Sequence, residues 1–356
     1  MASGFPIVAS LLYIIIANVA LRFLNDFSFP VSQENSTQVE ENDAFTARDL
    51  LAQIPPRQVD VLCSEKTHYC FVITERSETF EGRLMVFRGL QVRKDHPGLL
   101  LSYARLLIPK ELTFAMLLDT RPWKLDKTTV RLVYARTMIA GVFVSGAVQY
   151  NSTKNHNVLI VGLGGGVINN YLSSMPNQRL NITVVDIDPV MKKIAEKWYD
   201  FKESELHRIV VEDGIKYAKQ ASARGEKFDA ILLDLCTNER RALLCPIEEF
   251  LKNEALHNLA AILVDTGAVI VNIITGTEFR EEGPKEAKRV QERFEKHFAT
   301  CSMLVSETKE KMLYCFHKIA PNENKTETLL KMEIEMDKKL GFHLKDGKEY
   351  VASDIE

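Results

Sequence analysis

Glycines occupy four of five consecutive positions after an apolar run in the middle of the chain. The run VLIV is followed by Gly162, Gly164, Gly165 and Gly166, with only Leu163 between them. Glycines after a strand let the backbone approach a ligand, and a helix that starts there offers unpaired N–H groups. The dinucleotide fingerprint G-x-G-x-x-G fails, because its last position, counted from Gly162, is a valine. The turn therefore predicts a ligand site, and the residues downstream must identify the ligand.

Carboxylates end the next three apolar runs. They are Asp186 with Ile187 and Asp188, Asp213 with Gly214, and Asp234. An acid about twenty residues after such a turn can accept both hydrogen bonds of a ribose diol, the role we expect for Asp186. A carboxylate next to a glycine suits an adenine amino group, the role expected for Asp213. Asp188 precedes a proline and is instead expected to cap a helix.

The succession of these residues matters more than any one of them, because each acid alone could simply cap a helix. In an open parallel sheet, ligands bind at the carboxyl ends of the strands. Four successive strand ends with Gly, Asp, Asp-Gly and Asp favour one shared crevice. Asn272, at the end of a fifth run, is a weaker candidate for its wall. No His, Ser or Cys constellation indicates covalent catalysis, and no Cys/His spacing indicates a metal site.

Five apolar runs from residue 157 onward indicate the elements that must position these residues. They read VLIVG, ITVVD, IVVED, AILLD and AVIVNII, and each is separated from the next by enough chain for a helix. Runs without polar alternation suit strands buried on both faces, as in a parallel sheet. Two further runs, Ser302–Val305 and Met312–Phe316, flank a polar turn and should pair as a hairpin.

The chain before this region reads differently and predicts a small β-rich subdomain. Its expected strands are Val59–Leu62, Tyr69–Thr74 and Arg83–Arg88, and its expected helices are Leu99–Leu107 and Val130–Val144. The predicted order of segments is an apolar segment at 1–24, a polar linker at 25–48, the β-rich subdomain at 49–129, the ligand-binding domain at 130–318 and a charged tail at 319–356. The tail is expected to carry one loose helix.

Composition and charge exclude several classes of protein. The 356 residues suggest about two domains at roughly 150 residues each. A chain that is 46% hydrophobic and 26% charged is neither mainly disordered nor a polytopic membrane protein. The net charge of −3 gives no field over the whole chain that would attract nucleic acid.

The segment Ile7–Leu24 is apolar except for Asn18 and Arg22. About 18 residues at 1.5 Å each span roughly 27 Å, enough for a slightly thin hydrocarbon core. We expect an uncleaved, single-pass signal anchor of the secretory pathway. A cleaved signal peptide, which would leave a lumenal or secreted chain, and a buried core helix are the alternatives.

Six cysteines fall into three local pairs. They are Cys63 with Cys70, Cys236 with Cys245, and Cys301 with Cys315. The first and last pairs lie symmetrically about predicted turns, and the middle pair flanks the loop after the fourth run, so an oxidising lumen would allow three disulfides. Free buried cysteines are also common, so the sequence leaves the pairing open.

The motifs resemble a known family. Gly162–Gly166, the DIDP stretch from Asp186, Asp213-Gly214 and Asp234 are similar to the S-adenosylmethionine-binding pattern of class I methyltransferases, in the branch built like spermidine synthase. VLIVGLGGG, VDIDP and LDLC…CP look like the carboxy-terminal domain of the methyltransferases of elongation factor 1-alpha. The resemblance implies a Rossmann-like α/β fold with a mostly parallel seven-stranded sheet and an antiparallel terminal hairpin.

The same resemblance implies S-adenosyl-L-methionine as the cofactor. The residues expected to bind it are Gly162, Gly164, Gly165, Gly166, Asp186, Ile187, Asp213, Gly214 and Asp234. Asp234 is also the expected catalytic residue, either orienting an amine or contacting the methionine moiety; capping the following loop is its structural alternative.

The branch contains two chemistries, and three positions separate them. Aminopropyltransferases carry an Asp after the glycines, where this chain has Val167, and a second Asp in the fourth strand-end motif, where it has Thr237. Glu239 is displaced and cannot simply replace that second acid. The departures favour methyl transfer to a protein, on a lysine or an N-terminal amine. An aminopropyltransferase and a catalytically silent binding protein are the alternatives, and the branch implies self-association.

Overall fold

The computed structural model describes residues 45–80, 82–93, 100–276, 278–305, 310–317 and 325–342. The chain divides into two units, Met1–Phe45 and Thr46–Glu356, and the second holds every helix and strand given below. The expected anchor Ile7–Leu24 and all but the end of the linker lie outside the described residues. Within the described ranges, no helix has the length and apolar character needed to cross a membrane.

The main sheet has the strand order β11-β12-β10-β8-β5-β6-β7, with β9 paired to the end of β10. The strands are β5 Asn155–Val161, β6 Arg179–Asp186, β7 His207–Val211, β8 Phe228–Leu233, β9 Leu243–Cys245, β10 Leu263–Thr275, β11 Thr300–Val305 and β12 Lys311–Phe316. The pairs among β7, β6, β5, β8 and β10 are parallel, and β12 is antiparallel to both β10 and β11. The predicted parallel sheet and its terminal hairpin are confirmed.

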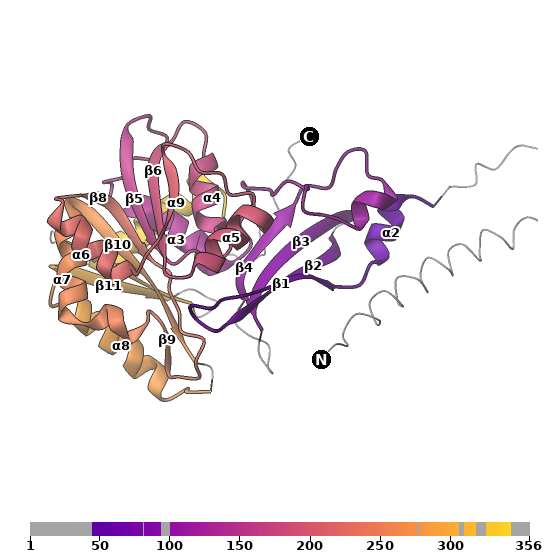
Figure 1. The fold of residues 1–356 in the computed structure, drawn as a ribbon. Helices are drawn as coiled ribbons and strands as arrows, with labels where there is room; N and C mark the ends of the chain where they lie inside the picture. Colours follow the sequence, from indigo (N-terminus) through magenta and orange to yellow (C-terminus); the bar gives the residue numbers. More distant parts are fainter. Residues whose placement is uncertain are drawn as a thin grey trace, which may run out of the picture. The chain divides into compact units, whose positions relative to one another are not determined.

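Helices cover both faces of this sheet (Figure 1). They are α3 Val133–Val144, α4 Val167–Ser174, α5 Pro189–Trp198, α6 Gly214–Ala223, α7 Asn253–Ile262, α8 Glu282–Phe294 and α9 Lys325–Leu340. Along β5, Val158 and Ile160 join the core that contains α3, α4, α5 and α9, whereas Leu159 and Val161 join the core that contains α6, α7 and α8. Both faces of each strand are therefore apolar, which explains the uninterrupted apolar runs.

A separate four-stranded antiparallel sheet precedes the main one (Figure 1). It comprises β1 Arg57–Cys63, β2 Cys70–Phe80, β3 Arg83–Val92 and β4 Leu100–Leu106, with helix α2 Ala47–Gln53 before it and the short helix η1 Phe114–Leu117 after it. The helix predicted at Leu99–Leu107 is wrong, because that segment forms β4. Ser102, Ala104 and Leu106 are buried at every second position, the spacing of a strand with one face in the core.

The expected loose helix of the tail is also wrong in one respect. Helix α9 forms, but Leu329, Met336 and the following Phe342 are buried in the core that contains α3. The buried Arg136 of α3 donates a 2.7 Å hydrogen bond to the carbonyl of Phe342. Helix α9 is therefore packed and not loose. The segment boundaries predicted at residues 129 and 318 stay predictions.

All three cysteine pairs form disulfides. Cys63 and Cys70 face each other across β1 and β2, and Cys301 and Cys315 face each other across β11 and β12. The third disulfide, Cys236–Cys245, joins the chain just after β8 to β9. The pairing that the sequence left open is therefore settled for the described chain.

Candidate active site

The glycine turn joins β5 to α4, as its position after a buried strand predicts. Gly162, Gly164 and Gly166 have φ of +99°, +53° and +83°, values that favour glycine. A Cβ on Gly162 would lie 2.0 Å from the carbonyl oxygen of Asp234, so the first and fourth strand ends meet at this position. Gly166 is the residue before α4 and has no side chain to cap the helix, so the amides of the first turn keep their capacity for a ligand.

Asp186, at the end of β6, holds the shape of that turn. One carboxylate oxygen accepts a 2.9 Å hydrogen bond from the amide of Leu163, and the other accepts one of 2.9 Å from the amide of Asp188. Burial raises the pKa of Asp186 to about 6, against the lowering effect of these two hydrogen bonds. Each oxygen keeps a second lone pair, as a ribose diol would require.

Asp188 caps α5, as predicted, and also ties the small sheet to the site. It accepts hydrogen bonds from the amide of Val190 at 2.9 Å, from the hydroxyl of Ser64 at 2.8 Å and from the hydroxyl of Thr67 at 2.8 Å. Both hydroxyls belong to the β1–β2 hairpin. The sequence pattern did not reveal this contact, which joins residues more than 120 positions apart.

Asp213 and Gly214 stand at the start of α6. A single oxygen of Asp213 accepts hydrogen bonds from the amides of Ile215 and Lys216 at 2.8 and 3.1 Å, so this acid is a helix cap. A Cβ on Gly214 would lie 2.5 Å from Cγ1 of Val161, the last residue of β5. The glycine therefore lets the third strand end pack against the first. The adenine contact expected of Asp213 stays a prediction.

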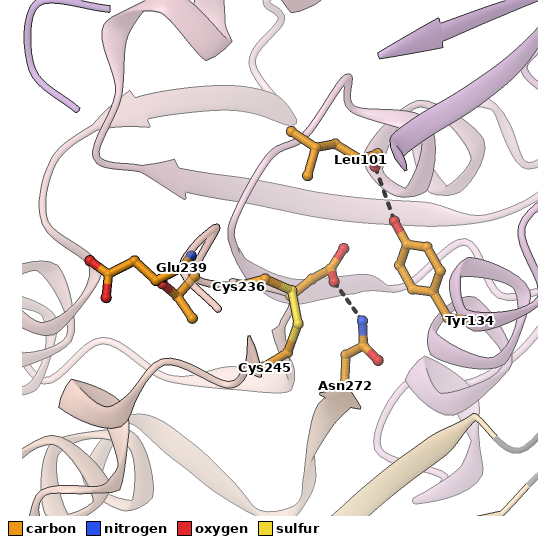
Figure 2. The surroundings of a disulfide bond; sticks show 8 residues. Leu101, Tyr134, Cys236, Glu239, Cys245 and Asn272 are labelled. Atoms are coloured by element: carbon orange, nitrogen blue, oxygen red, sulfur yellow. Dashed lines mark hydrogen bonds between the residues drawn. A yellow bond between two sulfur atoms is a disulfide. The ribbon is translucent and has the colours of Figure 1, made fainter. Parts of the chain in front are cut away.

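Asp234 follows β8 and is hydrogen-bonded to Asn272 of β10 (Figure 2). The amide nitrogen of Asn272 donates to the carboxylate at 3.0 Å, and Asn272 itself is 2% exposed. Burial raises the pKa of Asp234 to about 6, and the hydrogen bond from Asn272 lowers it in part. Asn272 thus lies where the sequence placed it, in the wall of the site.

Tyr134, which we did not predict as a site residue, comes from the start of α3. Its hydroxyl donates to the carbonyl of Leu101 at 3.2 Å (Figure 2). Burial, with a smaller contribution from the charge of Asp234, raises the pKa of Tyr134 well above its usual value. The tyrosine therefore stays a neutral donor.

A cleft of about 700 Å³ connects these residues. The predicted residues in its lining are Gly162, Gly164, Asp186, Ile187, Asp213, Gly214 and Asp234. Gly165 and Gly166 are not in the lining. A Cβ on Gly165 would lie 2.7 Å from the ring of Tyr199, so this glycine serves packing. Apolar side chains complete the walls, among them Tyr69, Phe71, Met191, Leu235 and Ile247.

The loop after Asp234 forms part of the lining of the cleft. Cys236, Thr237 and Glu239 line it, and the Cys236–Cys245 disulfide closes the loop on itself. Glu239 is exposed and forms an ion pair with Arg241. Figure 2 shows the Glu239 side chain pointing away from Asn272, so it does not supply a second carboxylate beside Asp234.

No protein-family model matches the chain. An eEF1A lysine and N-terminal methyltransferase homolog from Drosophila melanogaster is 28% identical over 184 residues, which are 49% of this chain and 26% of that protein. A polyamine aminopropyltransferase from Vibrio vulnificus is 32% identical over 140 residues, which are 39% of this chain and 42% of that protein. The chain therefore matches less than half of the length of either relative.

Two solved structures have the same fold. The human methyltransferase-like protein 13 in complex with SAH matches with a TM-score of 0.51 and 22% identity over 63% of this chain and 97% of that one. A probable spermidine synthase from Corynebacterium glutamicum matches with a TM-score of 0.53 and 13% identity over 84% of this chain and 99% of that one. The fold is thus the α/β fold of class I methyltransferases and spermidine synthase, as predicted.

Proposed function

We propose that this chain is an S-adenosylmethionine-dependent methyltransferase that modifies an amine of a protein. The observation that carries the proposal is the convergence of Gly162, Asp186, Asp213 and Asp234 on one cleft from four successive strand ends. Similarity to the Drosophila eEF1A lysine and N-terminal methyltransferase homolog supports a protein amine as the acceptor.

The residues of the cleft fit the cofactor. Gly162 leaves room in the turn, because a Cβ at this position would collide with the carbonyl oxygen of Asp234. Each carboxylate oxygen of Asp186 accepts one backbone hydrogen bond and keeps a second lone pair for the ribose diol. When bound, S-adenosylmethionine supplies a methyl group on a positively charged sulfur. Four aspartates of the lining suit a cation: Asp186, Asp188, Asp213 and Asp234.

Asp234 would orient the acceptor amine and accept its proton. A carboxylate whose pKa is raised to about 6 can hold a proton more readily than an exposed acid does. Asn272 fixes the orientation of the carboxylate through its 3.0 Å hydrogen bond. Positioning of the two reactants contributes most of the rate, because transfer from a sulfonium needs little further activation.

Three positions argue against aminopropyl transfer, although the Vibrio relative has that activity in its name. Val167 packs into the apolar core at the start of α4, so no carboxylate follows the glycines. Thr237 stands at the position of the second acid, and Glu239 pairs with Arg241 at the surface.

We also propose that the chain works in an oxidising compartment of the secretory pathway, held at a membrane by Ile7–Leu24. Three disulfides support the compartment, because such bonds persist where thiols are not kept reduced. The length and apolar character of the segment support the anchor. Protease protection of the cell-made protein tests the topology, and sequencing of its N-terminus separates an anchor from a cleaved signal.

Calorimetry with the full chain tests the enzyme proposal. S-Adenosylmethionine and S-adenosylhomocysteine should both bind, and decarboxylated S-adenosylmethionine should bind at least about tenfold more weakly. Preference for the decarboxylated form would instead identify an aminopropyltransferase, and no binding of any of the three would leave a silent protein with this fold. Mass spectrometry of a protein extract incubated with the enzyme and labelled cofactor then identifies the acceptor.

A further inference from the structure

The loop between Asp234 and β9 is short and lies beside the proposed acceptor site. It leaves β8 at Asp234, lines the cleft with Cys236 and Thr237, and returns through Cys245, which is fully buried. Its other contacts are non-covalent: the amide of Thr237 donates to the carbonyl of Leu244 at 2.8 Å, and the amide of Gly276 donates to the carbonyl of Ala242 at 3.1 Å. Arg240 forms an exposed ion pair with Glu278, and β9 pairs with β10 at two positions. The disulfide is therefore its one covalent tie across the loop.

The same disulfide fixes the chain two residues after Asp234. Cys236 is two residues after Asp234, and Cys245 pairs with Ile274, two residues after Asn272. Asp234 and Asn272 are hydrogen-bonded to each other. The residue two positions after Asp234 is in the disulfide, and the residue two positions after Asn272 pairs with the other cysteine of that disulfide. Figure 2 shows the disulfide in one close-up with Asn272, Tyr134 and Leu101, three residues that line the cleft.

We propose that Cys236–Cys245 is a positioning element for the acceptor: it holds the loop so that the carboxylate of Asp234 faces the incoming amine. The inference rests on the proposed function and deepens it. Loss of the disulfide should loosen the acceptor side of the cleft while the cofactor side, built on Gly162 and Asp186, keeps its shape.

The chain offers a matched control in Cys301–Cys315. Each of the two disulfides has one fully buried cysteine, and Cys301–Cys315 joins the paired strands β11 and β12. Cys301 and Cys315, however, are absent from the lining of the cleft. Replacing that pair removes a disulfide and some stability without touching the acceptor side.

The test compares two ligands whose binding does not require the acceptor to be known. S-Adenosylhomocysteine fills the cofactor side only, whereas sinefungin carries an amine in place of the transferred methyl group and so reaches the acceptor side. The ratio of their Kd values, measured by calorimetry at pH 7.5 on the full chain, reports how well Asp234 receives an amine. In the wild type, sinefungin should bind about tenfold more tightly, the effect of one charge-assisted hydrogen bond.

The double variant Cys236→Ala/Cys245→Ala should lose most of that preference, with the Kd of S-adenosylhomocysteine changed less than about threefold. Cys301→Ala/Cys315→Ala should keep the preference, and Asp234→Asn should abolish it. Should the first variant not fold, the same ratio is measured on folded wild type before and after reduction with a phosphine, with the released thiols mapped by mass spectrometry.

Each other result overturns the inference. Wild type that binds neither ligand refutes the proposed function and this inference with it. Wild type that binds both ligands without preference shows that Asp234 does not face the amine. An unchanged ratio in the Cys236/Cys245 variant, or an equal loss in both cysteine variants, refutes the positioning role alone. The positioning role is also refuted if peptide mapping of the untreated protein finds Cys236 and Cys245 as free thiols.

Discussion

Two of the acids at the strand ends have a pKa above that of an exposed carboxyl group. Burial raises the pKa of both Asp186 and Asp234 to about 6. Asp186 is surrounded by backbone amides, whereas the side-chain donor to Asp234 is Asn272. Asp186 therefore shapes the glycine turn of the proposed cofactor site. Asp234, whose side-chain donor is a single amide, is the acid that we expect to bind a cationic amine.

Replacing Asp234 by Asn should stabilise the ligand-free protein while it removes activity. The pKa of Asp234 rises from 3.8 unfolded to about 6 folded, so ionisation in the folded state costs stability as pH rises through that window. At pH 7.5 the variant should gain up to about 3 kcal/mol in unfolding free energy, and near pH 3.5 about none.

Urea unfolding of wild type and Asp234→Asn at several pH values checks this prediction. Asn keeps an oxygen that can accept the hydrogen bond from Asn272, so packing is preserved. A variant that is less stable than wild type at pH 7.5, or a difference that does not depend on pH, would contradict the assigned burial of charge.

Asp186→Asn tests the cofactor side. The amide oxygen can still accept a hydrogen bond from Leu163, but the charge is lost and the second donor, the amide of Asp188, meets an NH₂ group. We expect the Kd for S-adenosylhomocysteine to rise about tenfold or more, by calorimetry. Alanine is a poorer test, because it would leave both amides without their acceptor. An unchanged Kd would remove Asp186 from the ribose role.

The sequence predicted the strand-end acids because their signal is local: an apolar run, then a carboxylate. It did not predict Tyr134, Ser64 or Thr67, whose roles arise from contacts with distant parts of the chain. It also assigned Gly165 and Gly166 to the cofactor; neither is in the lining of the cleft, and their contact with the cofactor stays a prediction. A run of glycines does not tell which of them meets a ligand and which meets a neighbouring side chain.

At the scale of elements, the junction of β5 and β8 depends on one missing side chain. A Cβ on Gly162 would lie 2.0 Å from a backbone oxygen that belongs to Asp234, and the amide of Asp234 is itself bonded to the carbonyl of Val161 at 2.9 Å. Because neither backbone can move alone, Gly162→Ala should separate the two strand ends. We expect it to lower the unfolding free energy by at least about 3 kcal/mol.

Gly225→Ala is the matched control for that prediction. Gly225 has φ of +69° and nothing within 4 Å of its Cβ position, so alanine there should cost only the backbone strain of about 1 kcal/mol. Denaturant unfolding of both variants measures the difference. Equal losses in the two variants would mean that the contact with Asp234 carries no energy.

The elements of the parallel sheet were predictable because both faces of each strand are buried, which leaves an unbroken apolar run. Strand β4 was not, because its run LLSYARL fits a helix as well as a strand, and only pairing with β3 decides. Strand β9 has three residues and no sequence signal of its own. Helix α9 was expected, but its packing against α3 depends on Arg136 and Phe342.

At the scale of the whole domain, a buried ion pair of the small sheet also contacts helix α5. Arg88 of β3 and Glu75 of β2 are 1% and 3% exposed and lie 2.5 Å apart. Arg88 also donates to the carbonyl of Trp198, the last residue of α5, at 2.7 Å. Lys197 and the indole of Trp198 both bond to Asp60 of β1 at 2.7 Å. The end of α5 is therefore held by polar contacts from two strands of the small sheet, β1 and β3.

The two members of the ion pair should respond unequally to removal. Without Arg88, Glu75 keeps Arg57 at 3.2 Å and the hydroxyl of Thr120 at 2.6 Å. Without Glu75, the buried guanidinium of Arg88 keeps uncharged contacts: the carbonyls of Trp198 and Thr120, the hydroxyl of Thr120 and the ring of Trp198. Glu75→Leu should therefore cost about 3–5 kcal/mol, and Arg88→Met less.

Urea unfolding of the two single variants and the double variant measures this as a cycle. The double variant should be more stable than Glu75→Leu alone, because it no longer buries an unpaired charge. Arg76→Met is the control: Arg76 is 53% exposed and pairs with the half-buried Glu78, so its loss should cost about 1 kcal/mol or less. If Arg88→Met were as damaging as Glu75→Leu, the hydrogen bond from Arg88 to Trp198, and not the burial of an unpaired charge, would account for the loss.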